Sequence, residues 1–212
     1  MPQIINNYKI INLLFISLIC FIVLIDKDVN AIDNSDNYYL SKFIFLPLTN
    51  DKAKETDTDQ LLKTNSCPAC NLKNASLSGK NLSNANLEGA NLFEADLSKS
   101  NLNNANLINA ELVNSYMKNA NLSNAVLKDA VLSQADMEGA DLSYADLTNA
   151  SLKWAHLMNT NLSHAKLDGA DLSHANLFNA NITDAALTNT NLSGATWIDG
   201  KKCADESIGY CK

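Results

Sequence analysis

The chain contains no arginine, so all 16 of its basic residues are lysines, and they are outnumbered by 23 acidic residues. The net charge is −7, so the chain has no excess of basic residues of the kind that nucleic-acid binding requires. The sequence also has no glycine-rich phosphate loop and only three histidines, His156, His164 and His174. These absences argue against a nucleic-acid-binding protein and give no support to an enzyme.

The feature that the sequence does have is a five-residue repeat. Residues 70–199 divide, without insertion or deletion, into 26 consecutive frames. Ala occupies the first position of 20 frames, Asn or Asp the second position of 16, and Leu the third position of 22. The exceptions at the third position are also apolar: Met117, Met137, Ile182 and Trp197.

A period of five suits neither an α-helix nor a flat strand. In a helix it advances the face by about 140°, so the Leu column would spiral around the axis. In a strand an odd period sends alternate Leu residues to opposite faces. A short extended Ala-x-Leu piece followed by a two-residue turn avoids both problems, because Ala and Leu then point to the same side. Four such frames close a coil of 20 residues, which predicts an all-β solenoid of about six and a half coils and about 31 Å length.

The pattern Ala-(Asn/Asp)-Leu-x-x resembles that of the pentapeptide repeat family. This resemblance implies a right-handed quadrilateral β-helix and a non-enzymatic scaffold without a cofactor or catalytic site. The Cys67-Pro-Ala-Cys70 segment and the Cys-containing C-terminal tail, residues 200–212, resemble those of exported bacterial members.

Residues 1–31 are expected to be a signal peptide. The apolar run over residues 10–25 is short for a membrane span, which needs roughly 20 residues. Val29-Asn30-Ala31 follows with the small residues that a signal peptidase reads. Export to the periplasm or the exterior is therefore predicted, and an uncleaved membrane anchor formed by residues 10–25 is the alternative.

Short segments flank the repeat on both sides. Residues 32–69 are expected to form a linker and an N-terminal cap, with a short helix over residues 55–65 that covers the first coil. The β-helix domain then spans residues 70–199, and the tail, residues 200–212, caps its other end. Such caps protect the open edges that a stack of strands would otherwise expose.

Four cysteines lie outside the predicted signal peptide: Cys67, Cys70, Cys203 and Cys211. Bridged Cα atoms must lie within about 7 Å, and the two pairs sit at opposite ends of a rod about 31 Å long. Within one chain the rod therefore permits only Cys67–Cys70 and Cys203–Cys211. Export to an oxidising compartment would let both disulfides form. A redox centre at the CxxC segment, free thiols and metal binding are the alternatives.

The three histidines fall on three different faces of the predicted rod, so a shared metal site is not expected. One outward column does stand out, because Met158, Phe178 and Ile198 follow one another on successive coils of the same face. Contiguous exposed apolar surface often marks a contact site. The column predicts contact with a protein partner or a second copy, unless the tail folds over it through Ile208 and Tyr210.

The sequence thus predicts a non-enzymatic, exported structural or protein-interaction scaffold whose partner is unknown. Delivery as a secreted effector is one alternative. Another is a DNA-mimicking, topoisomerase-binding protein, as some family members are. Duplex DNA carries about one negative charge per 1.7 Å, or nearly three per coil of about 4.8 Å. The repeat has 13 acids and 7 lysines, which gives only about −1 per coil.

Overall fold

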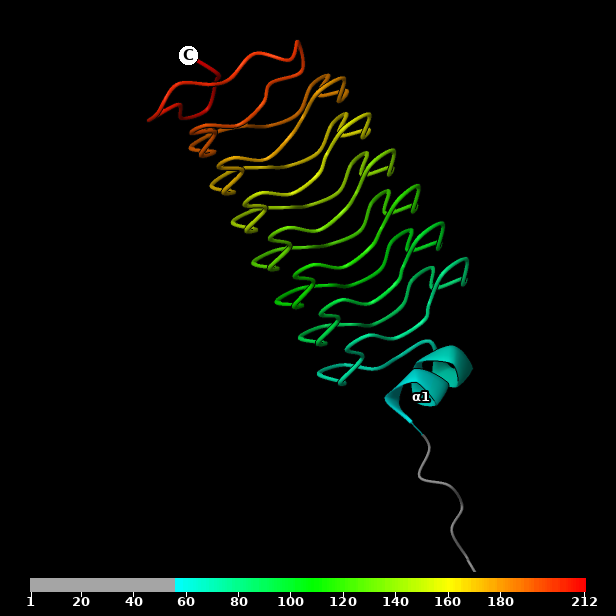
Figure 1. The fold of residues 1–212 in the computed structure, drawn as a ribbon. Helices are drawn as coiled ribbons and strands as arrows, with labels where there is room; N and C mark the ends of the chain where they lie inside the picture. The colour runs from blue at the N-terminus through cyan, green and yellow to red at the C-terminus, as the bar shows by residue number, and fades with distance from the viewer. Residues whose placement is uncertain (1–55) are drawn as a thin grey trace, which may run out of the picture. The chain divides into compact units, whose positions relative to one another are not determined.

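The computed structural model describes residues 56–212, which form one helix, α1 (Asp57–Thr64), and a stack of short bridged strands (Figure 1). Within residues 56–212, no helix is both long and apolar enough to cross a membrane. The expected signal peptide, residues 1–31, lies outside the described part, so its export role stays a prediction.

Helix α1 begins at a capping box. The Thr56 hydroxyl oxygen accepts a hydrogen bond from the Asp59 amide at 3.1 Å, and the Asp59 carboxylate accepts one from the Thr56 amide at 3.2 Å. The helix buries Leu61 completely. Its Asp57 carboxylate accepts a hydrogen bond from the backbone amide of Asn71 at 2.7 Å, which ties the helix to the first coil.

Parallel bridges join each strand to the strand 20 residues later, from Ser66↔Asn86 to Asn176↔Thr196. This offset means that four frames make one coil, and Figure 1 shows the coils stacked in succession. Pairing already begins within residues 65–69, one frame before residue 70. The reason is Cys67, which is fully buried at the third position that Leu fills elsewhere. The disulfide cysteine is therefore also the first residue of the interior.

Four faces run along the rod, and we number them by the frames that begin them. Face 1 starts at residues 70–74, face 2 at 75–79, face 3 at 80–84 and face 4 at 85–89, and each recurs every 20 residues. The first and third positions of a frame point inward, and the other three point outward. Each outward position therefore makes a column whose members lie one coil apart.

The interior is built from Leu and Ala layers, as the repeat predicts. Third-position side chains from Leu72 to Leu177 are at most 1% exposed, including Met117 and Met137. Two first positions of the first coil hold other residues, Cys70 in a disulfide and the exposed Lys80. At the four other first positions without Ala, a small hydroxyl residue takes its place and bonds a backbone carbonyl oxygen. These buried residues are Ser100, Ser115, Thr160 and Thr190.

Each frame turns through its last two positions, and side chains at two places stabilise the bend. The fifth residue has a positive φ in every frame but the last, such as 58° at Asn84 and 56° at Asn119, which explains why Asn and Gly are frequent there. At the second position, the side-chain oxygen of all sixteen Asn and Asp residues accepts the amide N–H two residues later, at 2.9–3.4 Å. These Asx turns are the local bonds for which the residue type is suited.

The C-terminal tail covers only part of the final coil. It pairs antiparallel with faces 1 and 2, through Asn191↔Ile208 and Thr196↔Lys202. On faces 3 and 4 the last inward residues, Ile182 and Leu187, are only partly buried. The tail therefore caps two of the four faces at this end.

Both predicted cysteine pairs are at bonding distance. Cys67 and Cys70 have an S–S distance of 2.04 Å and a Cα–Cα distance of 5.4 Å across one turn of the first coil. Cys203 and Cys211 have a Cα–Cα distance of 4.9 Å and close a loop within the tail. One disulfide thus fixes the start of the rod and the other fixes its C-terminal cover.

Candidate interaction surface

The column predicted from the sequence, Met158, Phe178 and Ile198, lies on face 2 at the fourth frame position. Phe178 is 42% exposed, and Met158 and Ile198 are partly buried. The backbone of Gly200 lies against the Phe178 ring, because a Cβ added there would be 3.4 Å from two ring carbons. We call these three residues the apolar ladder.

The rest of the tail takes a different course. Ile208 bridges to Asn191 on face 1, and the side chains of Ile208 and Tyr210 are both exposed. Gly200, at the start of the tail, lies against the apolar ladder at Phe178. The ring of Phe178 therefore keeps a large exposed surface.

Two exposed aromatic residues close to the ladder were missed by the sequence reasoning. Tyr116 is 51% exposed at a second position of face 2, and Trp154 is 55% exposed at the corner between faces 1 and 2. A signal was present in the sequence. Tyr116 replaces the usual Asn or Asp, and Trp154 stands at a fifth frame position, where Asn and Gly are the usual residues.

Two of the histidines stack on aromatic rings of the preceding coil. The rings of Trp154 and His174 have centroids 4.1 Å apart and planes 13° apart. Those of Tyr144 and His164 have centroids 4.6 Å apart. Within residues 56–212 no three His, Cys, Asp or Glu side chains gather as a metal site. The histidines here act as stacking partners.

A small ion-pair cluster crosses face 2 between Tyr116 and Met158. The Lys118 ammonium lies 3.0 Å from the Glu138 carboxylate and 3.4 Å from that of Asp136. The hydrogen bond to Glu138, followed by attraction to Asp136, raises the pKa of Lys118 above its ordinary value. All three side chains are partly open to solvent, so the cluster contributes little to stability.

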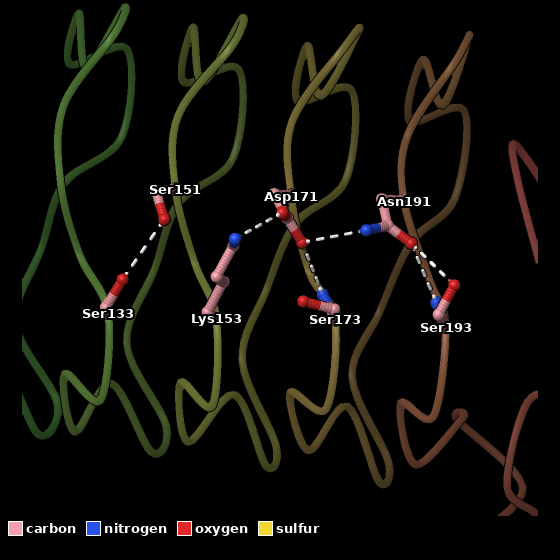
Figure 2. Close-up of polar contacts among 7 residues, drawn as sticks. All are labelled: Ser133, Ser151, Lys153, Asp171, Ser173, Asn191 and Ser193. Atoms are coloured by element: carbon pink, nitrogen blue, oxygen red, sulfur yellow. Dashed lines mark hydrogen bonds and ion pairs between the residues drawn. The ribbon is translucent and has the colours of Figure 1, made fainter. Parts of the chain in front are cut away.

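Face 1 carries polar side chains that bond one another from coil to coil (Figure 2). The Lys153 ammonium lies 3.1 Å from the Asp171 carboxylate, which also accepts a hydrogen bond from the Asn191 amide at 3.2 Å. Partial burial works to raise the pKa of Asp171, but hydrogen bonds from Ser173 and the Lys153 ammonium outweigh it and hold the pKa below its usual range. This face satisfies its own polar groups, in contrast with the apolar ladder.

Comparison with known proteins adds the following. A family model described as "Pentapeptide repeats" matches eight copies, over residues 70–107, 85–124, 120–157 and 155–194. No curated protein matches the chain.

Three solved structures are similar. HetL, a pentapeptide repeat protein involved in heterocyst differentiation regulation from the cyanobacterium Nostoc sp. strain PCC 7120, is 32% identical over 65% of this chain and 78% of its own, with a TM-score of 0.33. A pentapeptide repeat protein from the Arabidopsis thaliana thylakoid lumen is 25% identical over 64% of this chain and 83% of its own, with a TM-score of 0.31. QnrB1, a plasmid-mediated fluoroquinolone resistance protein, is 15% identical over 61% of this chain and 80% of its own, with a TM-score of 0.28.

Proposed function

Since the chain belongs to the pentapeptide repeat family, whose model matches more than half of it, we propose that it is a non-enzymatic, exported scaffold that binds a protein through its apolar ladder. The family resemblance carried by the Ala-(Asn/Asp)-Leu pattern is confirmed by this match. The bound protein is either a partner or a second copy of this chain.

The observation that carries the proposal is the contrast between outward columns. On face 3 the fourth position is Ser, Asn or Thr in every coil, at residues 83, 103, 123, 143, 163 and 183. On face 2 the same position becomes Met158, Phe178 and Ile198 over the last three coils. An exposed aromatic side chain flanked by two partly exposed aliphatic ones in one strip favours a contact from which water is excluded.

The disulfides at the two ends of the rod support export. A rod that carries a disulfide at each end is suited to an oxidising compartment, where such bonds persist. The signal peptide expected over residues 1–31 would deliver it there. Its cleavage and the compartment are parts of the proposal.

The two alternatives receive less support. A DNA mimic needs a dense negative surface, whereas Lys118, Lys128, Lys153 and Lys166 each lie within 4 Å of a carboxylate and partly neutralise it. A secreted effector would share the signal segment and the disulfides. It would differ only in the final location of the protein.

Site-specific photo-crosslinking in the natural host tests the proposal. A photoreactive phenylalanine at Phe178 should yield a discrete crosslinked species, and the same probe at Phe93 should not. Phe93 is the matched control because it is also a fourth-position phenylalanine, on face 1, with its ring under the Lys73 ammonium. Light scattering then separates a homodimer from a partner complex. No crosslink at either site, or the same species at both, would overturn the docking role.

A further inference from the structure

An open groove of about 430 Å³ lies at the corner between faces 1 and 2. It is lined by Asn114, Gln134, Trp154 and His156. Its size falls within the range of roughly 300–1,000 Å³ that small-molecule sites occupy. Its lining of one aromatic and three polar side chains is more polar than that of most small-molecule sites, which suits a ligand rich in hydroxyl groups.

The order of the coils shows which side of the indole borders this groove. Asn114, Gln134, Trp154 and His174 are the fifth-position residues of face 1 on four successive coils. His174 covers one face of the indole, at a centroid distance of 4.1 Å. The groove is lined by the residues on the other side, Gln134 and Asn114. Their side chains are shorter than the indole, so the face of Trp154 opposite His174 borders the groove.

We propose that this groove binds a pyranose ring of a neutral saccharide. The C–H bonds on one face of a pyranose carry a partial positive charge, which suits the negative face of an indole. The Asn114 and Gln134 amides both donate and accept hydrogen bonds, as ring hydroxyls require, and the His156 imidazole adds one more polar group. Its lining shares no residue with the apolar ladder.

The chemistry of the lining selects against charged ligands. No Lys, Asp or Glu is among the four lining residues. Asp136 is bridged to Tyr116 on one side and to His156 on the other. Its carboxylate lies 3.4 Å from the Lys118 ammonium. A phosphate group would find no cation here, and a quaternary ammonium ligand favours a cage of several aromatic rings, of which the groove has one.

The platform is held in place before any ligand arrives. The Trp154 amide donates to the Ser173 carbonyl oxygen at 3.1 Å, and the turn fixes φ at 61°. His174 then supports the ring from behind with planes 13° apart. The stack on His174 restrains the indole before binding, which lowers the side-chain entropy lost on binding and favours affinity.

Isothermal titration and saturation-transfer NMR on the full chain test the proposal. The probes are methyl β-D-glucopyranoside, methyl α-D-mannopyranoside and the β-1,4-linked hexamers of glucose and N-acetylglucosamine. We expect at least one to bind with a Kd of about 1 mM or tighter. Trp154→Asn should weaken binding at least tenfold. His174→Asn, which removes a positioning residue, should weaken it several-fold.

The controls separate binding from folding. Asn is the commonest residue at the fifth position and tolerates positive φ, so Trp154→Asn should keep its melting temperature. Tyr144→Asn is the matched control, because it removes another exposed, histidine-stacked aromatic residue outside the groove. Phe178→Asp should leave saccharide binding unchanged. The proposal is overturned if no probe binds at about 10 mM, or if Trp154→Asn binds as tightly as wild type.

Discussion

The hydroxyl group of Thr160 donates a buried hydrogen bond to the carbonyl oxygen of Met137, 3.0 Å away on the preceding coil. Thr190 repeats this bond to Leu167 at 2.7 Å. The hydroxyl of Ser100 instead bonds a carbonyl oxygen within its own turn. A first-position threonine therefore links two coils, which an alanine at the same place cannot do.

Replacing Thr160 with Val should lower the free energy of unfolding by about 1 kcal/mol, because the shape is kept and the buried bond is lost. The Met137 carbonyl oxygen still accepts the Ala140 amide at 3.0 Å, so no acceptor is left unpaired. Urea unfolding followed by circular dichroism measures the change. Thr188→Val, at an exposed site on face 4, is the control and should change stability little. Equal effects at both sites would contradict the role of the coil-to-coil bond.

A cavity in the middle of the rod should cost more than one near its open end. Leu127 is fully buried between neighbouring layers, so Leu127→Ala should lower stability by about 2–5 kcal/mol. Leu187 is only partly buried, so Leu187→Ala should cost less. Because each coil contacts only its neighbours, the central change also weakens the link between the two halves of the rod. Denaturant unfolding of both variants measures the difference, and equal losses would contradict the partial cover of the last coil.

The interior could be predicted from the sequence because it repeats. A period of five with Ala and Leu two residues apart allows few solutions, and the 20-residue bridge offset is the one that the turns favour. Residue type favours the Asx turns, because Asn and Asp readily bond the backbone two residues on, and all sixteen second-position Asn and Asp residues do so. The same register placed Met158, Phe178 and Ile198 in one column.

The surface could be predicted less well, because the repeat does not determine which residues occupy its outward positions. Its contacts depend on residues one coil away, as for Trp154 and His174, which are 20 positions apart in sequence. The tail has no repeat, so its cover of only two faces could not be read from its composition. The cysteine spacing predicts only a disulfide for Cys67, but the repeat spacing also puts it at the position of an inward Leu.

Acid should weaken the rod through carboxylates such as Asp146. Partial burial works to raise the pKa of Asp146, but hydrogen bonds from the Thr148 hydroxyl and amide, with the Lys128 ammonium, outweigh it and lower the pKa. A lowered folded-state pKa adds stability above the unfolded value of about 3.9, and this stability is lost as pH falls through the folded pKa. Thermal melts between pH 7 and 2.5 should therefore show a falling melting temperature below about pH 4.

The control for this pH effect is Asp146→Asn. Asn occupies the second position of many frames and accepts the same backbone bond there, as Asn161 does from Ser163. The variant should unfold with a shallower dependence on pH below about 4, because it has no charge to lose. An unchanged acid slope would show that other carboxylates carry the effect.

The cysteines of the natively produced protein should resist thiol labelling at Cys67, Cys70, Cys203 and Cys211. Removing the second bond with Cys203→Ser and Cys211→Ser should cost the tail about 2–3 kcal/mol, from the entropy of closing its short loop. The Leu192 amide, which donates to Ser207 in the tail, should then exchange hydrogen faster. Amides of the middle coils serve as the internal control. Four free thiols in native protein would contradict export to an oxidising compartment.

Gly79 and Gly139 separate the cost of a backbone conformation from the cost of a contact. Both are fifth-position residues of face 2, with φ of 67° and 68°. A Cβ at Gly79 meets nothing within 4 Å, so Gly79→Ala should cost only the left-handed backbone penalty of about 1 kcal/mol. A Cβ at Gly139 would lie 2.6 Å from the side-chain oxygen of Asn119 on the preceding coil, so Gly139→Ala should cost more. Adding Asn119→Gly to Gly139→Ala should remove the excess cost over Gly79→Ala. A double-mutant cycle from urea unfolding would then give a coupling energy between the two sites. Equal costs at Gly79 and Gly139, with no coupling, would mean that the Asn119 side chain simply moves aside.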